Sequence, residues 1–416
     1  MQTALADFIK DTPEGQEADA ILRKCVHCGF CTATCPTYQL LGDELDSPRG
    51  RIYLVKQVLE GVTPTASTQL HLDRCLTCRS CETTCPSGVQ SGRLADIGRK
   101  LVDDQVGRPV HQRLLRRALS VVLPRAWLFA PLVAMGRLMR PLLPAALAHK
   151  VPATNPARGE WPAARHARKM LVLAGCVQPV LAPDINAAAA RVLDRLGVSL
   201  IEAAGGGCCG ALRYHLNYQG DGLDDMRALI DAWWPMVERG EIEAVIMTAS
   251  GCGSMVKEYG HLLAHDAAYR DKAARISALT RDLAEIIAAE LARPGALAAL
   301  DLDNLGKPEA KLAFHPPCSL QHGQQVKGVA EKILTMAGFE LVPVADAHLC
   351  CGSAGTYSIL QPTLSGQLQQ AKLAALGAGG AARIATANIG CLSHLQERSV
   401  LPVEHWISTL ERQMGR

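Results

Sequence analysis

The same cysteine pattern occurs twice in the first ninety residues of this chain. It reads CVHCGFCTATCP from residue 25 and CLTCRSCETTCP from residue 75, so both copies are C-x2-C-x2-C-x3-C-P. Three thiolates spaced three residues apart can each bind one iron of a single [4Fe–4S] cube. The fourth Cys lies too far along the chain for that cube and ligates the other one, and the Pro after it turns the backbone away.

The spacing therefore predicts two [4Fe–4S] clusters with crossed ligands. We expect the first cluster on Cys25, Cys28, Cys31 and Cys85. We expect the second on Cys75, Cys78, Cys81 and Cys35. Zinc is the alternative, but zinc sites normally use paired C-x2-C knuckles separated by a dozen or more residues. Three consecutive Cys at spacing three, followed by Cys-Pro, fit that arrangement poorly.

Composition excludes several classes of protein. With 416 residues and 16 Cys, the chain is too long for a small secreted disulfide scaffold. Its 48% hydrophobic and 20% charged residues, with a net charge of +3, exclude a disordered chain and a generic nucleic-acid binder. It has no run of 18 mainly apolar residues, and its N-terminus carries acids, so we expect neither a transmembrane helix nor a secretory signal. In a cytoplasmic chain, this many Cys indicates metal binding.

The spacer between the two cysteine motifs has helical periodicity. Ser47 and Pro48 suit an N-cap and a first helical position. Ile52, Val55 and Leu59 then recur at helical spacing. Leu94, Ile97 and Leu101 repeat that spacing after the second motif. Residues 1–105 are therefore predicted to form an α-helical ferredoxin domain.

The other eight cysteines form a second duplication, of about 140 residues. One set is Cys176, Cys208, Cys209 and Cys252, and the other is Cys318, Cys350, Cys351 and Cys391. The lone Cys precedes the Cys-Cys-Gly (CCG) pair by 32 residues in both sets. The runs MLVLAG and AVIMTA are strand-like, and 187–196 and 329–336 are helical, so each repeat is predicted to be α/β.

Four thiols converging on Gly-rich turns at strand ends suggest a soft-metal site in each repeat. Two other interpretations stay open, redox-active thiols and buried Cys that only pack as small hydrophobic residues. The segment Gly205–Gly210 matches G-x-G-x-x-G, but the dinucleotide fingerprint also needs a following helix and an acidic residue about twenty positions later. Because the Cys pair recurs at Cys350 without the glycines, we do not interpret this segment as a nucleotide site.

The fold class predicted is α+β, with the helical two-cluster module followed by two duplicated α/β cysteine-rich domains. We place the ferredoxin domain at 1–105, a basic apolar helical connector at 106–149, a linker at 150–168, CCG domain 1 at 169–295 and CCG domain 2 at 296–416. Residues 105–169 hold twelve Lys or Arg and one acid, Glu160. Pro124, Pro131, Pro141 and Pro144 are expected to break any long helix there. This connector suits an anionic membrane surface or a partner groove, and the alternative is a helical hairpin packed on the ferredoxin module.

This arrangement of motifs resembles the iron–sulfur subunit family of glycolate oxidase (glycolate dehydrogenase). The segments PTYQLLGDELDSPRGR, HLDRCLTCRSCETTCPSGV, DAWWP, TASGCGSMVKEYG, HLCCGSAGTYS and TANIGCLSH carry the resemblance. It covers nearly the whole chain. Similar architectures occur in the C subunit of anaerobic glycerol-3-phosphate dehydrogenase, in lactate-utilisation proteins and in heterodisulfide reductase subunits.

The resemblance implies an electron-transfer component of a glycolate dehydrogenase complex, with no catalytic residue of its own. Flavoprotein partner subunits carrying FAD would oxidise glycolate or a similar D-2-hydroxy acid, and this chain would pass the electrons towards quinone. It also implies a cytoplasmic location with peripheral contact on the inner face of the cell membrane. A zinc-binding scaffold without redox activity is the alternative from another class.

The CCG repeats depart from the fullest version of this pattern. Heterodisulfide-reductase-like repeats end each set with C-x2-C, whereas Met255 and His394 stand at those positions here. Pro316 stands in HPPC, where a further Cys would be plausible. We interpret His394 as a structural residue, with a role as a fifth ligand of the second site as the alternative. Four other histidines near the cysteines are interpreted as structural or supporting residues: His27, His315, His322 and His348.

Overall fold

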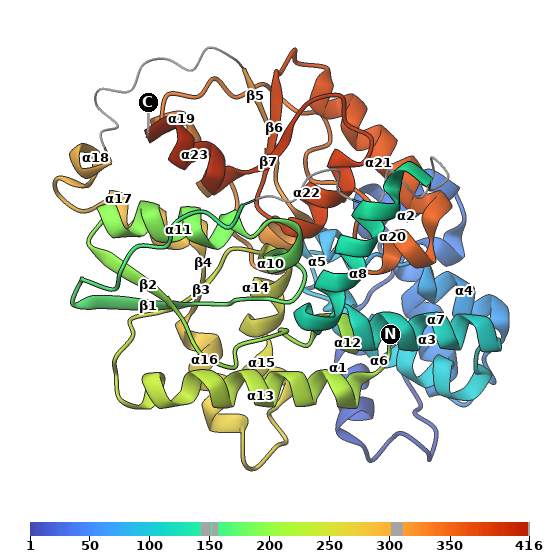
Figure 1. Ribbon diagram of the computed structural model, residues 1–416. Coiled ribbons are helices and arrows are strands. Elements are labelled where there is room, and N and C mark those ends of the chain that lie inside the picture. Colours follow the sequence, from blue (N-terminus) through green and yellow to red (C-terminus); the bar gives the residue numbers. More distant parts are fainter. Residues whose placement is uncertain (143–150, 152–156, 301–310, 415–416) are drawn as a thin grey trace. The chain divides into compact units, whose positions relative to one another are not determined.

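The computed structural model describes residues 1–142, 151, 157–300 and 311–414 (Figure 1). Parts of the predicted connector (143–149) and linker (150 and 152–156) therefore lie outside the described residues. The chain divides into two compact units. Unit 1 comprises residues 1–117 and 348–372, and unit 2 comprises 118–347 and 373–416. The domain boundaries drawn from the sequence stay predictions.

The described part of unit 1 is helical. Its elements are α1 (Pro13–Lys24), η1 (Phe30–Thr34), α2 (Pro36–Leu41), η2 (Glu44–Asp46), α3 (Pro48–Leu59), α4 (Ala66–Asp73), α5 (Ser80–Thr84), α6 (Ser91–Val106) and α20 (Tyr357–Leu360). Helices α7 (Val110–Val122) and α21 (Pro362–Gly377) each contain a boundary between the units.

Helix α3 begins as its sequence predicts. The Ser47 hydroxyl accepts a hydrogen bond from the backbone N–H of Gly50, and Pro48 is the first helical residue. Ile52, Val55 and Leu59 are buried with residues of α1, α4 and α6 in one core. Gly98 lets α6 approach α3 closely, because an added Cβ there would overlap the Val55 side chain. This packing fixes α4 and α6, and the second cysteine motif lies between these two helices in the sequence.

Unit 2 contains two parallel sheets. The first has the strand order β2-β1-β3-β4 and the second the order β5-β6-β7. Their strands are β1 (Arg168–Val172), β2 (Val198–Glu202), β3 (Val245–Met247), β4 (Thr280–Asp282), β5 (Leu312–His315), β6 (Arg383–Thr386) and β7 (Val403–His405). The helical N-terminal part and these parallel sheets confirm the predicted α+β class.

The helices of unit 2 that surround the first sheet are α10 (Gln178–Leu181), α11 (Asp184–Arg195), α12 (Ala211–His215), α13 (Gln219–Glu238), α14 (Ser250–Lys257), α15 (Tyr259–Leu262), α16 (Arg270–Leu279), α17 (Leu283–Leu291) and α18 (Ala296–Ala299). Those of the second repeat are the π-helical turn η4 (Ser319–Gly323), α19 (Val329–Met336), α22 (Ile389–Gln396) and α23 (Trp406–Met414). Helices α11 and α19 confirm the two helices expected from periodicity.

The first sheet is covered on both faces, as Figure 1 shows for α11 and α17 on one side and α13 with α16 on the other. Side chains alternate along a strand, so Met170 and Val172 of β1 enter one core, whereas Leu171 enters the opposite core. The core around α11 and α17 also contains Leu312 and Phe314 of β5. The two repeats therefore share one hydrophobic core within unit 2.

Helix α8 (Ala126–Met139), followed by the short turn η3 (Arg140–Leu142), has no buried residue. The prolines of the connector were expected to break any long helix, yet Pro131 lies inside α8. A proline within a helix removes one hydrogen bond without always ending the helix. Within the described residues, no single helix has the length and apolarity to cross a membrane; α7 and α8 pass that test only as a pair bent by 109°.

Candidate metal centres

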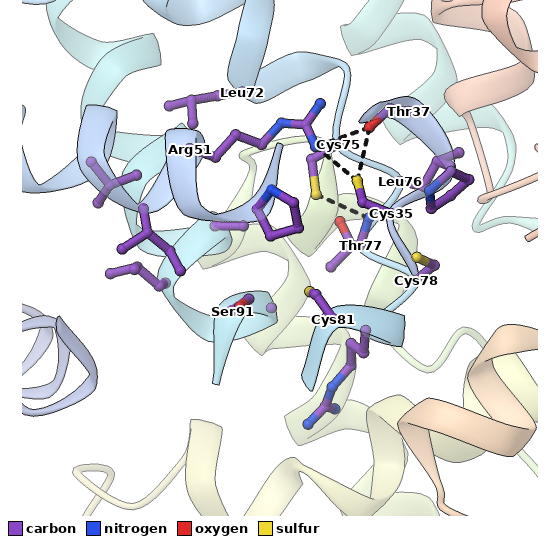
Figure 2. A pocket seen from close by; sticks show the side chains of 18 residues that line it. Cys35, Thr37, Arg51, Leu72, Cys75, Leu76, Thr77, Cys78, Cys81 and Ser91 are labelled. Atoms are coloured by element: carbon purple, nitrogen blue, oxygen red, sulfur yellow. Dashed lines mark hydrogen bonds between the residues drawn. The ribbon is translucent and has the colours of Figure 1, made fainter. Parts of the chain in front are cut away.

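Four cysteines of unit 1 line one cavity of about 40 Å³ (Figure 2). Cys75, Cys78 and Cys81 come from the second motif, and Cys35 comes from the first. Cys35 lies between η1 and α2, Cys75 follows α4, and Cys81 lies in α5. This is the set expected for the second cluster, although the ligand assignment itself stays a prediction.

The two motifs share one backbone conformation. His27 and Gly29 of the first motif have φ of 56° and 86°, and Thr77 and Arg79 of the second have φ of 52° and 61°. The left-handed conformation costs an L-residue roughly 1–2 kcal/mol. This left-handed conformation occurs at matched positions in the two motifs and bends each Cys loop around a centre. A loop that presents three thiols to one cluster needs such a bend.

The cavity combines sulfur donors with apolar walls. Pro48, Ile52, Val55, Leu72 and Leu94 are among its lining residues. Burial raises the pKa of the Cys81 thiol far above its ordinary value, and the nearby sulfurs of Cys75 and Cys35 raise this pKa further. Such thiols become good ligands when a cation replaces their protons. Four soft donors around a small, mainly apolar space fit an iron–sulfur cluster.

Hydrogen bonds already converge on these sulfurs. Cys35 Sγ lies 3.4 Å from the Thr37 hydroxyl, and the backbone N–H of Thr77 donates to Cys75 Sγ at 3.5 Å. The Arg51 guanidinium lies 3.9 Å from Cys35 Sγ (Figure 2). Donors to cluster sulfurs are among the groups by which proteins set reduction potentials.

The first quartet is brought together in part. Burial raises the pKa of Cys31 to about 11, and the sulfurs of Cys25 and Cys85 contribute to the shift. These three residues therefore lie within electrostatic reach of one another, two from the first motif and one from the second. Cys28 is exposed. All sixteen cysteines lie within the described residues and are free thiols.

In unit 2 the first CCG set converges at the carboxyl ends of neighbouring parallel strands. Cys176 follows β1, Cys208 and Cys209 follow β2, and Cys252 lies in α14 after β3. The thiols of Cys176 and Cys209 donate to Cys208, and this keeps the pKa of Cys208 below its ordinary value. A further hydrogen bond joins Cys209 to Cys252. Four adjacent sulfurs offer the donor set of a soft-metal site.

A carboxylate, a guanidinium and a phenol support this first CCG set. The buried hydroxyl of Tyr259 donates to the carbonyl of Cys209 at 2.9 Å. Arg213 donates to Asp225 at 2.7 Å. Burial, with the nearby Cys208 sulfur, raises the pKa of Asp225 to about 7. Sequence analysis named none of these residues individually, although Tyr259 lies in the segment TASGCGSMVKEYG, and Arg213 and Asp225 belong to no repeated motif.

The cysteines of the second CCG set are divided between the units. Cys318 precedes η4 and Cys391 lies in α22, both in unit 2, whereas Cys350 and Cys351 belong to the 348–372 segment of unit 1. The Asn388 amide donates to Cys391 Sγ at 3.6 Å. His394 is buried in α22. A four-sulfur site in the second repeat therefore stays a prediction.

Comparison with known proteins agrees with both halves of this arrangement. Residues 21–89 match the 4Fe-4S dicluster domain, and residues 170–257 and 312–396 match the cysteine-rich domain CCG. The chain is 52% identical to the glycolate oxidase iron-sulfur subunit of Escherichia coli, with 100% of both chains covered. The chain belongs to the glycolate oxidase iron–sulfur subunit family.

More distant relatives share parts of this architecture. A probable glycolate oxidase iron-sulfur subunit of Bacillus subtilis is 28% identical over 90% of this chain and 88% of its own length. Lactate utilization protein A of Bacillus licheniformis is 27% identical, over 55% of this chain and 91% of its own length. Family membership makes this chain an iron–sulfur, electron-transfer component of a redox complex.

Proposed function

We propose that this chain carries electrons from flavoprotein subunits that oxidise glycolate, or a similar D-2-hydroxy acid, towards quinone. The observation that carries the proposal is the cavity lined by Cys35, Cys75, Cys78 and Cys81. The name of the Escherichia coli relative supports glycolate as the substrate of the complex.

Two [4Fe–4S] clusters are proposed on the crossed cysteine sets given above. When bound, each cluster supplies one-electron storage. The chain itself supplies the thiolates, the Thr77 N–H that donates to Cys75 Sγ, the Thr37 hydroxyl in contact with Cys35 Sγ, and apolar side chains that line the cavity. A further metal centre is proposed on Cys176, Cys208, Cys209 and Cys252, and another on the second CCG set.

The flavin is proposed to lie on partner subunits. Oxidation of a hydroxy acid to an oxo acid releases two electrons, which a flavin can accept together, whereas a cluster accepts one at a time. A chain with two clusters can therefore connect a two-electron donor to one-electron steps. Family membership as a subunit supports a complex with other chains.

Peripheral contact with the inner face of the cell membrane is proposed for α8. Trp127 and Leu138 are 72% and 82% exposed. Arg125 immediately precedes the helix, and Arg137 and Arg140 lie at its end. Exposed apolar side chains flanked by arginines are the features with which a short helix binds an anionic membrane surface.

A lactate-oxidising complex is the second candidate, and the lactate utilization relatives favour it. Anaerobic purification of the chain with its partner subunits separates the candidates, since the associated flavoprotein would be reduced by glycolate in one case and by lactate in the other. About eight irons and eight acid-labile sulfides per chain are expected from the two clusters alone. A colourless protein that contains zinc instead would refute the electron-transfer function.

A further inference from the structure

The side chain of Arg51 is buried beside the cavity of the second cysteine quartet (Figure 2). Its Nε donates to the carbonyl of His71 at 2.8 Å, and its other nitrogens donate to Thr37 Oγ1 at 3.0 Å and Asp46 Oδ1 at 3.2 Å. These three contacts hold the guanidinium in one orientation, with a terminal nitrogen 3.9 Å from Cys35 Sγ. A buried arginine held this way is a fixed positive charge in a medium of low dielectric constant.

Asp46, the carboxylate partner of Arg51, does not fully neutralise the charge of this arginine. Asp46 is fully buried and also accepts a hydrogen bond from Arg74 at 2.8 Å, so two guanidiniums share one carboxylate. Arg79, which also lines the cavity, pairs with Glu82 at 2.9 Å and adds no net charge. Positive charge therefore exceeds negative charge among the residues of these ion pairs. Burial opposes the Arg51 charge, yet the sulfurs of Cys75 and Cys35, with Asp46, raise the pKa of this guanidinium.

The first quartet has a different electrostatic environment. The N-terminal ammonium of Met1 donates to the carbonyl of Cys25 at 2.8 Å. The nearby arginine side chain, Arg49, is 36% exposed and pairs with Glu44, which is 46% exposed. An exposed pair of opposite charges is neutral overall and is screened by solvent. The two quartets therefore share their loop conformation but differ in where the positive charge lies. At the second quartet a buried guanidinium lies 3.9 Å from a cysteine sulfur, whereas at the first the ammonium contacts a backbone carbonyl.

We propose that Arg51 raises the reduction potential of the cluster on Cys35, Cys75, Cys78 and Cys81 above that of the cluster on Cys25, Cys28, Cys31 and Cys85. The inference rests on the proposed function, because it assumes both ligand sets. A one-electron reduction adds one negative charge to a cluster and breaks no bond. A fixed positive charge next to one sulfur stabilises that added charge. A single electron delivered by the partner flavin then resides on the second cluster.

The potentials can be measured on the anaerobically purified complex by a dithionite titration followed by EPR. Two one-electron transitions are expected. The transition at higher potential should be altered or lost in Cys35→Ser and retained in Cys28→Ser. The opposite assignment would overturn the inference and leave the electron-transfer function intact. A protein without iron or without any cluster signal would instead refute the proposed function.

Substitution of Arg51 tests whether its charge raises the reduction potential of the second cluster. In Arg51→Gln, the ratio of reduced to oxidised second cluster should fall at least about tenfold at a fixed potential, which is about 59 mV for one electron. Arg51→Lys should recover most of the shift, because it keeps the charge. Lys100→Gln, which removes a charge from an exposed pair on α6, should leave both transitions in place.

A purely structural role for Arg51 predicts a different result. Arg51→Gln would then lose iron or thermal stability, with no change in the potential of the clusters that remain. If Arg51→Gln fails to bind iron, Arg74→Gln removes the neighbouring guanidinium and should lower the same transition. Unchanged potentials in every variant that binds two clusters would refute the inference.

Discussion

The hydroxyl of Tyr357 donates a hydrogen bond to the carbonyl of Arg74 at 3.1 Å, across 283 residues of sequence. Arg74 immediately precedes Cys75, and Tyr357 follows the Cys350–Cys351 pair in the same segment of unit 1. The Tyr357 side chain is buried, and burial, together with the nearby sulfurs of Cys75 and Cys350, raises the pKa of its phenol. This contact fixes the segment that carries the second CCG pair to the loop of the second cluster motif.

Tyr357→Phe should therefore destabilise unit 1. The substitution keeps the aromatic ring but leaves a carbonyl without its donor, at a cost of about 1–2 kcal/mol in the free energy of unfolding. Chemical denaturation followed by circular dichroism measures it. Tyr53→Phe is the control, since Tyr53 is 46% exposed and should change stability very little. Equal stability of the two variants would show that the Tyr357 hydrogen bond contributes nothing.

The proposed function predicts that Cys75→Ser interrupts electron flow without affecting the flavin chemistry of the proposed partner. Serine is a poor ligand for iron in place of a thiolate, so the second cluster should be lost or altered. We expect glycolate to reduce the flavin at the wild-type rate, while quinone reduction by the purified complex falls to background. Ser67→Ala, at an exposed position of the preceding helix α4, is the control. Wild-type quinone reduction by Cys75→Ser would contradict the ligand assignment.

Stability should fall in acid because of His405. This buried side chain accepts a hydrogen bond at Nδ1 from the N–H of Ile407 at 3.3 Å and contacts the carbonyl of Thr248 through Nε2 at 3.0 Å. Burial lowers its pKa to about 4, from about 6.5 in the unfolded chain. The stabilising contribution is complete above pH 6.5 and is lost as the pH falls towards 4, by about 3 kcal/mol.

The midpoint of thermal unfolding between pH 4 and pH 8 measures this loss. His405→Gln should show a smaller decrease than the wild type over the same interval. His111→Gln, at an exposed position, should follow the wild-type curve. Parallel curves for wild type and His405→Gln would exclude His405 as the group responsible.

The membrane contact proposed for α8 predicts that replacing its exposed apolar side chains weakens binding to anionic vesicles. Trp127→Glu with Leu138→Glu removes two exposed apolar side chains and adds negative charge, and each apolar side chain contributes about 1.5–3 kcal/mol when buried. Sedimentation of the complex with vesicles containing anionic lipid should therefore show at least about tenfold weaker binding. Val400→Glu is the matched control, since Val400 is 97% exposed elsewhere in unit 2. Unchanged binding of the double variant would assign α8 another role.

Gly98→Ala should destabilise the helical core of unit 1. The added methyl group would overlap Val55, and overpacking of this kind costs about 1–3 kcal/mol. Gly220→Ala in α13 is the control, because its Cβ would meet no neighbouring atom. Gly98→Ala should lower the thermal midpoint, whereas Gly220→Ala should leave it unchanged or raise it slightly. Recovery of the lost stability by a second change, Val55→Ala, would identify the overlap as the cause.

The sequence by itself predicted the features that depend on spacing, of which the crossed ligand assignment stays a prediction. Cys spacing predicted the crossed quartets, and the pattern from Ser47 to Leu59 predicted α3 with its cap. Apolar runs predicted β1 and β3, since parallel strands covered on both faces are nearly continuous in hydrophobicity. Duplicated Cys spacing predicted two α/β repeats. Each of these signals is a regular spacing or a repeat within the sequence, so it can be recognised without knowing the fold.

Only the tertiary structure decided which distant residues surround the cysteines. Arg51 precedes Ile52 in α3, and both side chains are buried. A charged residue next to a core residue of a helix is the one local sign in the sequence that Arg51 has a specific partner. Its contacts with Asp46, Thr37 and the carbonyl of His71 arise from the packing of α3 against η2 and α4. Tyr357 reaches Arg74 from a segment assigned by sequence to another domain. Burial of a charged side chain depends on packing between elements that are distant in the sequence, so the spacing of residues along the chain does not predict it.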